Sequence, residues 1–253
     1  VETNVVSKIR IDDAVRRILR QKFRLGLFKN PFPDATFVSK IGTKAHRDKA
    51  RQAVRESLVL LKNDDNLLPI SKLTSKIVVV GEHANNSGLQ SGGWTVNWQG
   101  SLKSYKGATT ILEGIKNKSS GKVVYDKEAS AAHYDADLAI VVVGETPYAE
   151  FFGDIGHESN TRQLTLTKKH QQYIDTYSKQ GVKTIVVLIS GRPLVVTNEI
   201  NKSNAFVAAW LPGSEGEGIA EVLFGDYNFK GKLPHSWPKF VKDFNEKYGP
   251  NFW

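Results

Sequence analysis

Leu138-Ala139-Ile140-Val141-Val142-Val143 is a continuous apolar run, rich in β-branched residues and free of charge. A strand that is apolar at every position is covered on both faces, as strands of a parallel sheet are. Similar runs lie at residues 77–80 and 184–189, with a less β-branched run at 205–211 and a weaker one at 123–125. We therefore predict a buried strand at each of these places.

Helical patterns separate these runs. Thr110 and Glu113 have capping-box spacing, a second helix spans about residues 167–180 before Gly181, and a third covers about 214–225. Alternating strands and helices predict an α/β fold, an open doubly wound sheet with right-handed crossovers. We expect residues 231–237 to return as an edge strand, antiparallel to the rest.

The N-terminal part has a different pattern. Residues 1–30 predict a helix that is entered near Asp12 or Asp13 and ends around Gly26. Its apolar residues recur at helical spacing and should face a core: Ile11, Val15, Ile18 and Leu19. The Pro-bearing residues 30–34 indicate a linker, and a second helix is expected over about 44–61.

Composition narrows the class of protein. The 253 residues carry a net charge of +9, but Lys and Arg are spread along the chain without a nucleic-acid motif, so we expect no nucleic-acid partner. The longest apolar run, residues 205–211, is too short to cross a bilayer, so we expect no membrane insertion. Cysteine is absent, which excludes disulfide and thiolate chemistry. Methionine is also absent and the first residue is Val1, so we expect a part of a longer protein.

Several kinds of site are disfavoured. Residues 213–218 read G-x-x-G-x-G and place two glutamates where a pyrophosphate would approach a helix, so a structural turn is the better interpretation. No Walker motif or G-x-S-x-G elbow is present. The six histidines show no metal-ligand spacing. We expect neither a cofactor nor a metal.

Acidic residues follow the strand at 138–143, which is where open α/β sheets bind ligands. Glu145, Glu150, Asp154 and Glu158 alternate there with aromatic residues. Aromatic neighbours can desolvate a carboxyl and raise its pKa towards neutrality, as a general acid requires. A loop carboxyl is more often simply solvated, and the pattern alone does not choose among the four.

A second constellation is the segment Gly92-Gly93-Trp94-Thr95-Val96-Asn97-Trp98-Gln99-Gly100. Two indoles four residues apart in a loop are not explained by helical core periodicity. Indole faces stack on pyranose rings, and Asn and Gln can bond hydroxyl groups. The segment favours a sugar platform; the alternative is that one tryptophan belongs to the core and the other forms a lid.

These segments, taken together, resemble the C-terminal part of glycoside hydrolase family 3, specifically the exo-acting β-glucan glucohydrolases and β-glucosidases. The matching stretches are residues 11–19, 57–63, 92–100, 143–150, 188–193, 208–216 and 223–226. The resemblance implies a TIM-like barrel followed by an α/β sandwich with a mostly parallel six-stranded sheet. Residues 1–42 would then be the interdomain region at the end of a barrel that this chain lacks, 43–240 the sandwich domain, and 241–253 a truncated tail.

The resemblance also implies a function. The chain would belong to a retaining exo-acting β-glucosidase that removes glucose from non-reducing ends of β-linked oligo- or polysaccharides. Glu150 would be the general acid/base with a raised pKa in the empty site, Trp98 one jaw of an aromatic sugar clamp, and Trp94 its support. The nucleophilic aspartate would lie on the barrel, so the chain alone should be inactive. Family analogy favours a secreted or periplasmic protein; the alternative function is a non-catalytic carbohydrate-binding domain.

Overall fold

The computed structural model describes residues 3, 5–130, 133–153, 164–241 and 243. The chain divides into two compact units, Val1–His46 and Arg47–Trp253. Each unit is described by itself. Asp154 and Glu158, two of the four candidate acids, lie outside the described residues.

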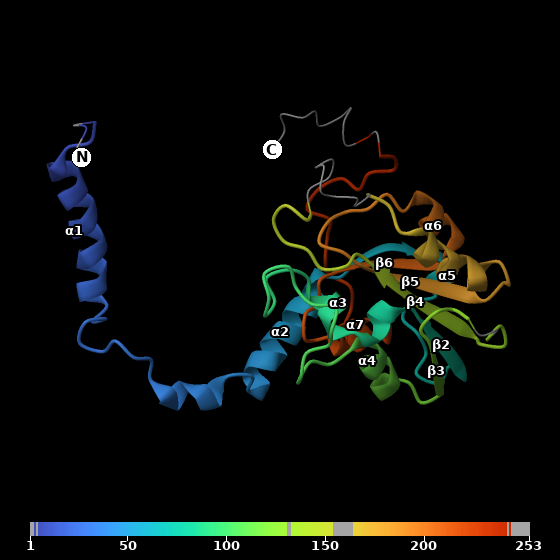
Figure 1. The fold of residues 1–253 in the computed structure, drawn as a ribbon. Coiled ribbons are helices and arrows are strands. Elements are labelled where there is room, and N and C mark those ends of the chain that lie inside the picture. Colours follow the sequence, from blue (N-terminus) through green and yellow to red (C-terminus); the bar gives the residue numbers. More distant parts are fainter. Residues whose placement is uncertain (1–2, 4, 131–132, 154–163, 242, 244–253) are drawn as a thin grey trace. The chain divides into compact units, whose positions relative to one another are not determined.

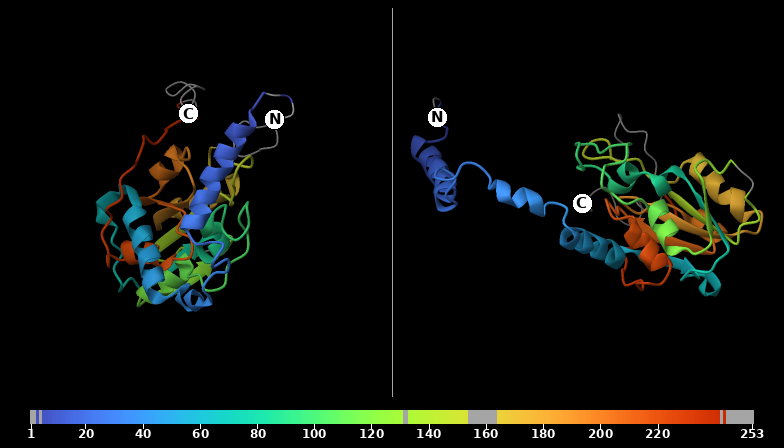
Figure 2. Two further views of the ribbon diagram at one scale, coloured as in Figure 1. Left: turned by 90° about the vertical axis from the view of Figure 1, so that its left-hand side faces the viewer. Right: turned by 90° about the horizontal axis from the view of Figure 1, so that it is seen from below.

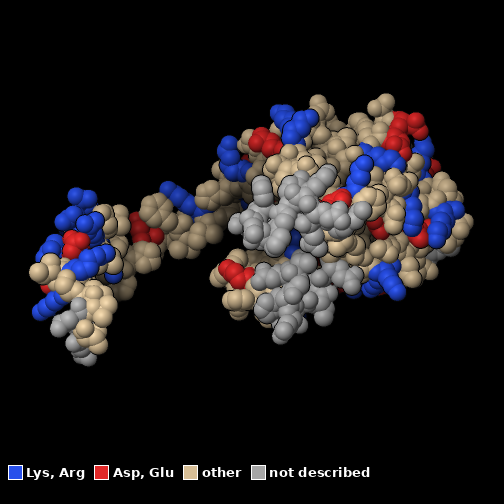
Figure 3. Space-filling model, turned by 90° about the horizontal axis from the view of Figure 1, so that it is seen from above, with Lys and Arg blue, Asp and Glu red and all other residues tan. Residues whose placement is uncertain are grey.

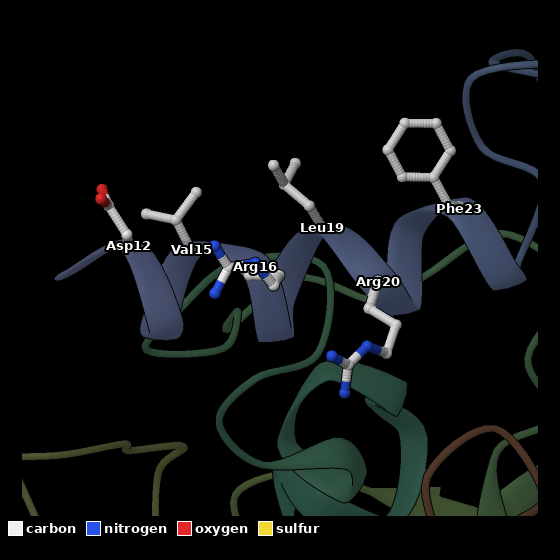
Figure 4. A pocket seen from close by; sticks show the side chains of 6 residues that line it. All are labelled: Asp12, Val15, Arg16, Leu19, Arg20 and Phe23. Carbon is white, nitrogen blue, oxygen red and sulfur yellow. The ribbon is translucent and has the colours of Figure 1, made fainter. Parts of the chain in front are cut away.

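The first unit contains helix α1 (Lys8–Arg24) and the 3-10 helix η1 (Ala35–Lys40). The Ser7 hydroxyl caps α1 by accepting a hydrogen bond from the amide of Arg10, so the helix begins earlier than expected. Figure 4 shows a groove on α1, where Val15, Leu19 and Phe23 project from one side. None of the described residues of α1 is buried within this unit, so the core contact of its apolar stripe stays a prediction.

The second unit is built on a six-stranded sheet with the order β1-β6-β5-β4-β2-β3 (Figure 1). The strands are β1 (Val59–Asn63), β2 (Lys76–Val80), β3 (Lys122–Asp126), β4 (Leu138–Gly144), β5 (Lys183–Ile189) and β6 (Ala205–Trp210). Strand β1 runs antiparallel to β6, and the other neighbouring strands are parallel. The predicted α/β class, mostly parallel with one antiparallel edge, is confirmed.

Helices cover both faces of this sheet (Figures 1 and 2). The helical elements are α2 (Lys44–Ser57), η2 (Asp64–Asn66), η3 (Glu82–Asn85), α3 (Ser87–Ser91), α4 (Ile111–Lys118), α5 (Lys168–Ser178), α6 (Thr197–Lys202) and α7 (Glu217–Leu223). On β4, Ile140 and Val142 join the core beneath α2, α4 and α7, whereas Val141 and Val143 join the core beneath α5. The two cores explain why the central strands are apolar at every position.

The antiparallel edge strand is not the predicted one. Residues 231–237 lie within the described part of the chain and form no strand; Trp237 instead donates its indole N–H to the carbonyl of Leu194 at 2.7 Å. The edge is β1, whose first residues were expected to continue helix α2. Lys62 on β1 donates to the carbonyls of Ile200 and Ser203 at the end of α6, a long-range contact that local sequence does not reveal.

An ionic cluster joins α2 to the start of α7. The buried Glu215 carboxylate pairs with Arg47 at 3.0 Å and Arg51 at 3.1 Å, and Arg55 pairs with Glu221 at 2.6 Å. The predicted helix start at Ser214 is wrong because Glu215 serves this cluster, and α7 begins at Glu217. On the face drawn in Figure 3, basic groups lie scattered among acidic ones. Within the described residues, no helix has the length and apolarity needed to cross a membrane.

Candidate functional site

The loop of residues 145–153, here called the acid loop, follows β4 at the carboxyl edge of the sheet. Arg192, just after β5, anchors it by donating to one oxygen of Glu145 from Nη2 at 2.7 Å and from Nε at 3.1 Å. The hydroxyl of Tyr148 donates to the other oxygen at 3.1 Å. The Arg192 guanidinium also lies 4.7 Å from the centre of the Tyr148 ring and donates to the carbonyl of Gly153. Glu145 therefore serves as an ion-paired anchor.

The segment of residues 92–100, here called the tryptophan loop, follows β2 and α3. The amide of Trp94 donates to the carbonyl of Trp98 at 2.8 Å, which closes the loop into a tight turn. Trp94 has φ 57° and Val96 has φ 63°, and Phe151 on the acid loop has φ 70°. Left-handed backbone at a non-glycine residue costs about 1–3 kcal/mol, so both loops hold strained conformations.

The two loops are in direct contact. A Cβ atom at Gly93 would lie 2.1 Å from the carbonyl oxygen of Tyr148, so glycine is required for this approach. Gln99 spans the same contact: its Oε1 accepts from the amide of Ala149 at 2.8 Å, and its Nε2 donates to the carbonyl of Glu150 at 3.3 Å. The tryptophan loop and the acid loop therefore form one surface.

Glu150 lies at the exposed tip of this surface. Its Oε2 accepts a 2.7 Å hydrogen bond from the indole N–H of Trp98. The rings of Trp94 and Trp98 have centroids 6.4 Å apart, and Phe151 meets Trp98 edge-on at 6.3 Å. Trp94 is 70% exposed and Trp98 45% exposed, so neither is a core residue. The structure thus brings together Glu150, Trp94 and Trp98, the three residues singled out from the sequence.

The expected rise in the pKa of Glu150 is not observed in this chain. The hydrogen bond from Trp98 lowers the pKa below its ordinary value, and Trp94 contributes in the same direction. Desolvation acts the other way but is weak, because the carboxyl group lies at the surface. The aromatic neighbours stabilise the charged form through an N–H donor and do not bury it.

Two polar residues of the site were missed by sequence reasoning. Gln99 was noted only as a partner for sugar hydroxyls, although its position beside Trp98 places it at the loop contact. Arg192 follows a buried strand at the ligand-binding edge, and a charged residue there is a usable signal. Sequence spacing could not reveal that both contact the acid loop.

His83 contacts the start of the acid loop, and His170 lies beside His83. The Nε2 atom of His83 is 3.1 Å from the carbonyl of Glu145, and the rings of His83 and His170 are 5.3 Å apart. Among the described residues, neither Nδ1 atom has a hydrogen-bond partner. The described residues contain no group of three or more side chains suited to a metal ion.

The geometry limits the chemistry that this edge can perform. Of the two described carboxyl groups on the acid loop, Glu145 is ion-paired to Arg192, whereas Glu150 is open to a ligand. A carboxyl group beside two exposed indoles can exchange a proton with a sugar stacked on those rings. The surface therefore suits proton transfer to or from a carbohydrate.

Known proteins share this architecture. A sequence profile of the glycosyl hydrolase family 3 C-terminal domain matches residues 58–252. The lysosomal beta glucosidase of Dictyostelium discoideum is 33% identical over 98% of this chain and 32% of its own length. The periplasmic beta-glucosidase of Salmonella typhimurium is 30% identical over 95% of this chain and 36% of its own length. The chain thus spans about a third of these relatives.

Solved structures agree with the sequence comparison. The exo-1,3/1,4-beta-glucanase ExoP of a Pseudoalteromonas species superimposes with a TM-score of 0.83 at 42% identity, over 95% of this chain and 32% of that chain. A beta-glucosidase of Listeria innocua in complex with isofagomine gives a TM-score of 0.78 at 30% identity, over 94% of this chain and 34% of that chain.

Proposed function

The chain belongs to glycosyl hydrolase family 3 and contains its C-terminal domain, and from this premise we propose that it supplies the acid/base side of a retaining β-glucosidase site. The observation that carries the proposal is the open carboxyl group of Glu150 beside Trp98 and Trp94. Glu150 would be the general acid/base. Trp98 would stack on the sugar beyond the cleavage point, with Trp94 as its support.

The proposed reaction has two steps. In the first, a carboxylate on a barrel domain outside this chain attacks the anomeric carbon, the glycosidic C–O bond breaks, and Glu150 gives its proton to the leaving oxygen. In the second, Glu150 takes a proton from water, the water oxygen bonds to the anomeric carbon, and the ester to the nucleophile breaks. The lowered pKa of Glu150 suits the second step directly. Protonation for the first step would follow closure of the site against the barrel and its nucleophile.

The substrate and its surroundings follow from the same premise. Two relatives are named as beta-glucosidases and a solved neighbour as an exo-1,3/1,4-beta-glucanase, which supports glucose removal from non-reducing ends of β-linked oligo- or polysaccharides. A relative from Formosa agariphila is named a beta-xylosidase, so xylose is the competing unit. The lysosomal and periplasmic names of two relatives support a secreted or periplasmic location.

We propose that residues 1–42 connect this domain to the barrel and that 43–240 form the sandwich domain. The division of the chain near His46 supports the first boundary. The chain without a barrel would lack the nucleophile and would hydrolyse nothing. Turnover of an aryl β-glucoside by the 253-residue chain alone would contradict this proposal.

Glu150→Gln in the full-length protein tests the central assignment. The kcat/KM for a β-glucoside with a poor leaving group should fall by about 10²–10⁴-fold, because acid catalysis is lost, while substrate affinity is retained. Glu56→Gln, a change on α2, is the matched control. Unchanged turnover in Glu150→Gln together with retained glycan binding would instead favour the alternative, a non-catalytic carbohydrate-binding domain on the exposed Trp94 and Trp98 rings.

A further inference from the structure

The side chain of Gln99 holds the backbone on either side of the Glu150 side chain. Gln99 bonds the amide of Ala149 and the carbonyl of Glu150, and thereby fixes the dipeptide that bears the carboxyl group. Gln99 also follows Trp98, which bonds the carboxyl group itself. Adjacent residues of the tryptophan loop therefore contact both the side chain and the backbone of Glu150.

Arg192 holds the acid loop from its base. Its guanidinium pairs with Glu145 at the start of the loop, donates to the carbonyl of Gly153 at the end, and lies over the ring of Tyr148 between them. Only a planar guanidinium can make these contacts at once, because an ammonium group is a single point donor. Arg192 therefore ties the two ends of the loop together around the position of Glu150.

We propose that Gln99 and Arg192 are positioning residues for proton transfer by Glu150; this inference rests on the function proposed above. Among the described residues, the hydrogen bonds, ion pair and ring contact of these two side chains are all made to the acid loop. Glu150 itself is exposed and Phe151 beside it holds a left-handed backbone, so the loop needs external support to keep one conformation. A displacement of about 1 Å at a reacting group can cost about 10²-fold in rate.

The experiment uses Gln99→Ala and Arg192→Lys in the full-length protein, with aryl β-glucosides that span poor and activated leaving groups. For poor leaving groups, kcat/KM should fall about 10- to 100-fold. For 2,4-dinitrophenyl β-glucoside, which needs no proton in the bond-breaking step, kcat/KM should stay within about threefold of the wild type. The kcat on that activated substrate should fall, because the second step still needs Glu150 as a general base. Azide should restore this kcat, because azide attacks the anomeric carbon without a general base.

Two control variants match these changes elsewhere in the domain. Gln52→Ala removes an amide that bonds Glu56 on α2, and Arg55→Lys weakens an ion pair to Glu221. Both should show the same dependence on the leaving group as the wild type. A purely structural role for Gln99 or Arg192 would lower kcat/KM equally for all substrates, and that result would overturn the inference.

Failure of the inference can be told apart from failure of the proposed function. If Glu150→Gln abolishes turnover of poor substrates while Gln99→Ala and Arg192→Lys behave as wild type, the positioning role is wrong and the acid/base role stands. If Glu150→Gln retains turnover, both are wrong. Agreement between Gln99→Ala and Arg192→Lys, which contact different ends of the loop, would support a shared positioning role.

Discussion

The indole Nε1 of Trp98 donates a 2.7 Å hydrogen bond to Oε2 of Glu150, a residue 52 positions away in the sequence. The two residues lie on loops that follow β2 and β4, which are neighbouring parallel strands. Since the carboxyl ends of parallel strands share one edge of the sheet, the fold itself places these loops side by side. The hydrogen bond then links an aromatic surface to an ionisable group.

Trp98→Phe should raise the pKa of Glu150. Phenylalanine keeps an aromatic ring but lacks the N–H donor that is the main cause of the lowered pKa. The carboxyl ¹³C signal of Glu150, assigned by comparison with Glu150→Gln, measures the change. Trp94→Phe should raise the pKa less, because Trp94 contributes less to the shift. An unaltered titration midpoint in Trp98→Phe would show that the hydrogen bond is absent in solution.

Gly93→Ala should separate the tryptophan loop from the acid loop. The added Cβ would meet the Tyr148 carbonyl at 2.1 Å, closer than any real contact, so one loop must move. We expect a loss of about 1–3 kcal/mol in the free energy of unfolding and a change in tryptophan fluorescence. Gly107→Ala is the control: no described atom lies within 4 Å of the new Cβ, and only its left-handed φ of 84° adds strain. Fluorescence should stay unaltered in Gly107→Ala.

Arg51→Met should weaken the attachment of α2 to α7. Glu215 is 1% exposed and, among the described residues, would keep only Arg47 as an ion-pair partner. Removing a whole partner from a buried pair costs about 3–5 kcal/mol, so we expect about 2 kcal/mol here, measured by urea unfolding. Lys179→Met breaks the exposed pair with Asp175 and should cost about 0–1 kcal/mol. An equal loss in the free energy of unfolding in the two variants would contradict a stabilising ion pair between Arg51 and the buried Glu215.

Acid should destabilise the domain through His170. Burial lowers the pKa of this imidazole to about 4, from an ordinary value near 6.5. Between these values the unfolded chain binds a proton that the native chain does not, so the free energy of unfolding falls as the pH falls from about 6.5 to about 4. His170→Phe should remove at most about 3 kcal/mol of this loss. Urea unfolding of the wild type and His170→Phe at pH 7 and pH 4.5 measures the difference, and an equal loss in both proteins would contradict the role of His170.

The sequence was sufficient for the central strands because burial on both faces leaves a clear pattern. The run beginning at Leu138 became β4, and Thr110 and Glu113 form the predicted capping box. The edge strand β1 was missed because only its first residue is buried and because its residues also fit the apolar spacing of α2. Its pairing with β6 is a long-range contact, and local spacing cannot report such a contact.

The candidate site was predicted less completely. The family resemblance selected Glu150, Trp94 and Trp98, and the structure brings these three together. The residue pattern alone did not choose among the four candidate acids. The pKa direction was wrong because aromatic composition does not say whether a ring buries a carboxyl group or donates an N–H to it. Arg192 and Gln99 were missed because both contact the acid loop from segments distant in the sequence, and the residue pattern within one segment does not predict such contacts.

The left-handed backbones of Trp94, Val96 and Phe151 have a consequence for heat tolerance. Phe151 contacts Trp98 across the two loops and Val96 is exposed, whereas the sheet is held by two apolar cores. Strained segments with little buried apolar surface open at lower free energy than the body of a domain. Moderate warming should therefore disorder the two loops reversibly while circular dichroism still reports an intact sheet. Cooling should restore the ordered loops without refolding of the domain.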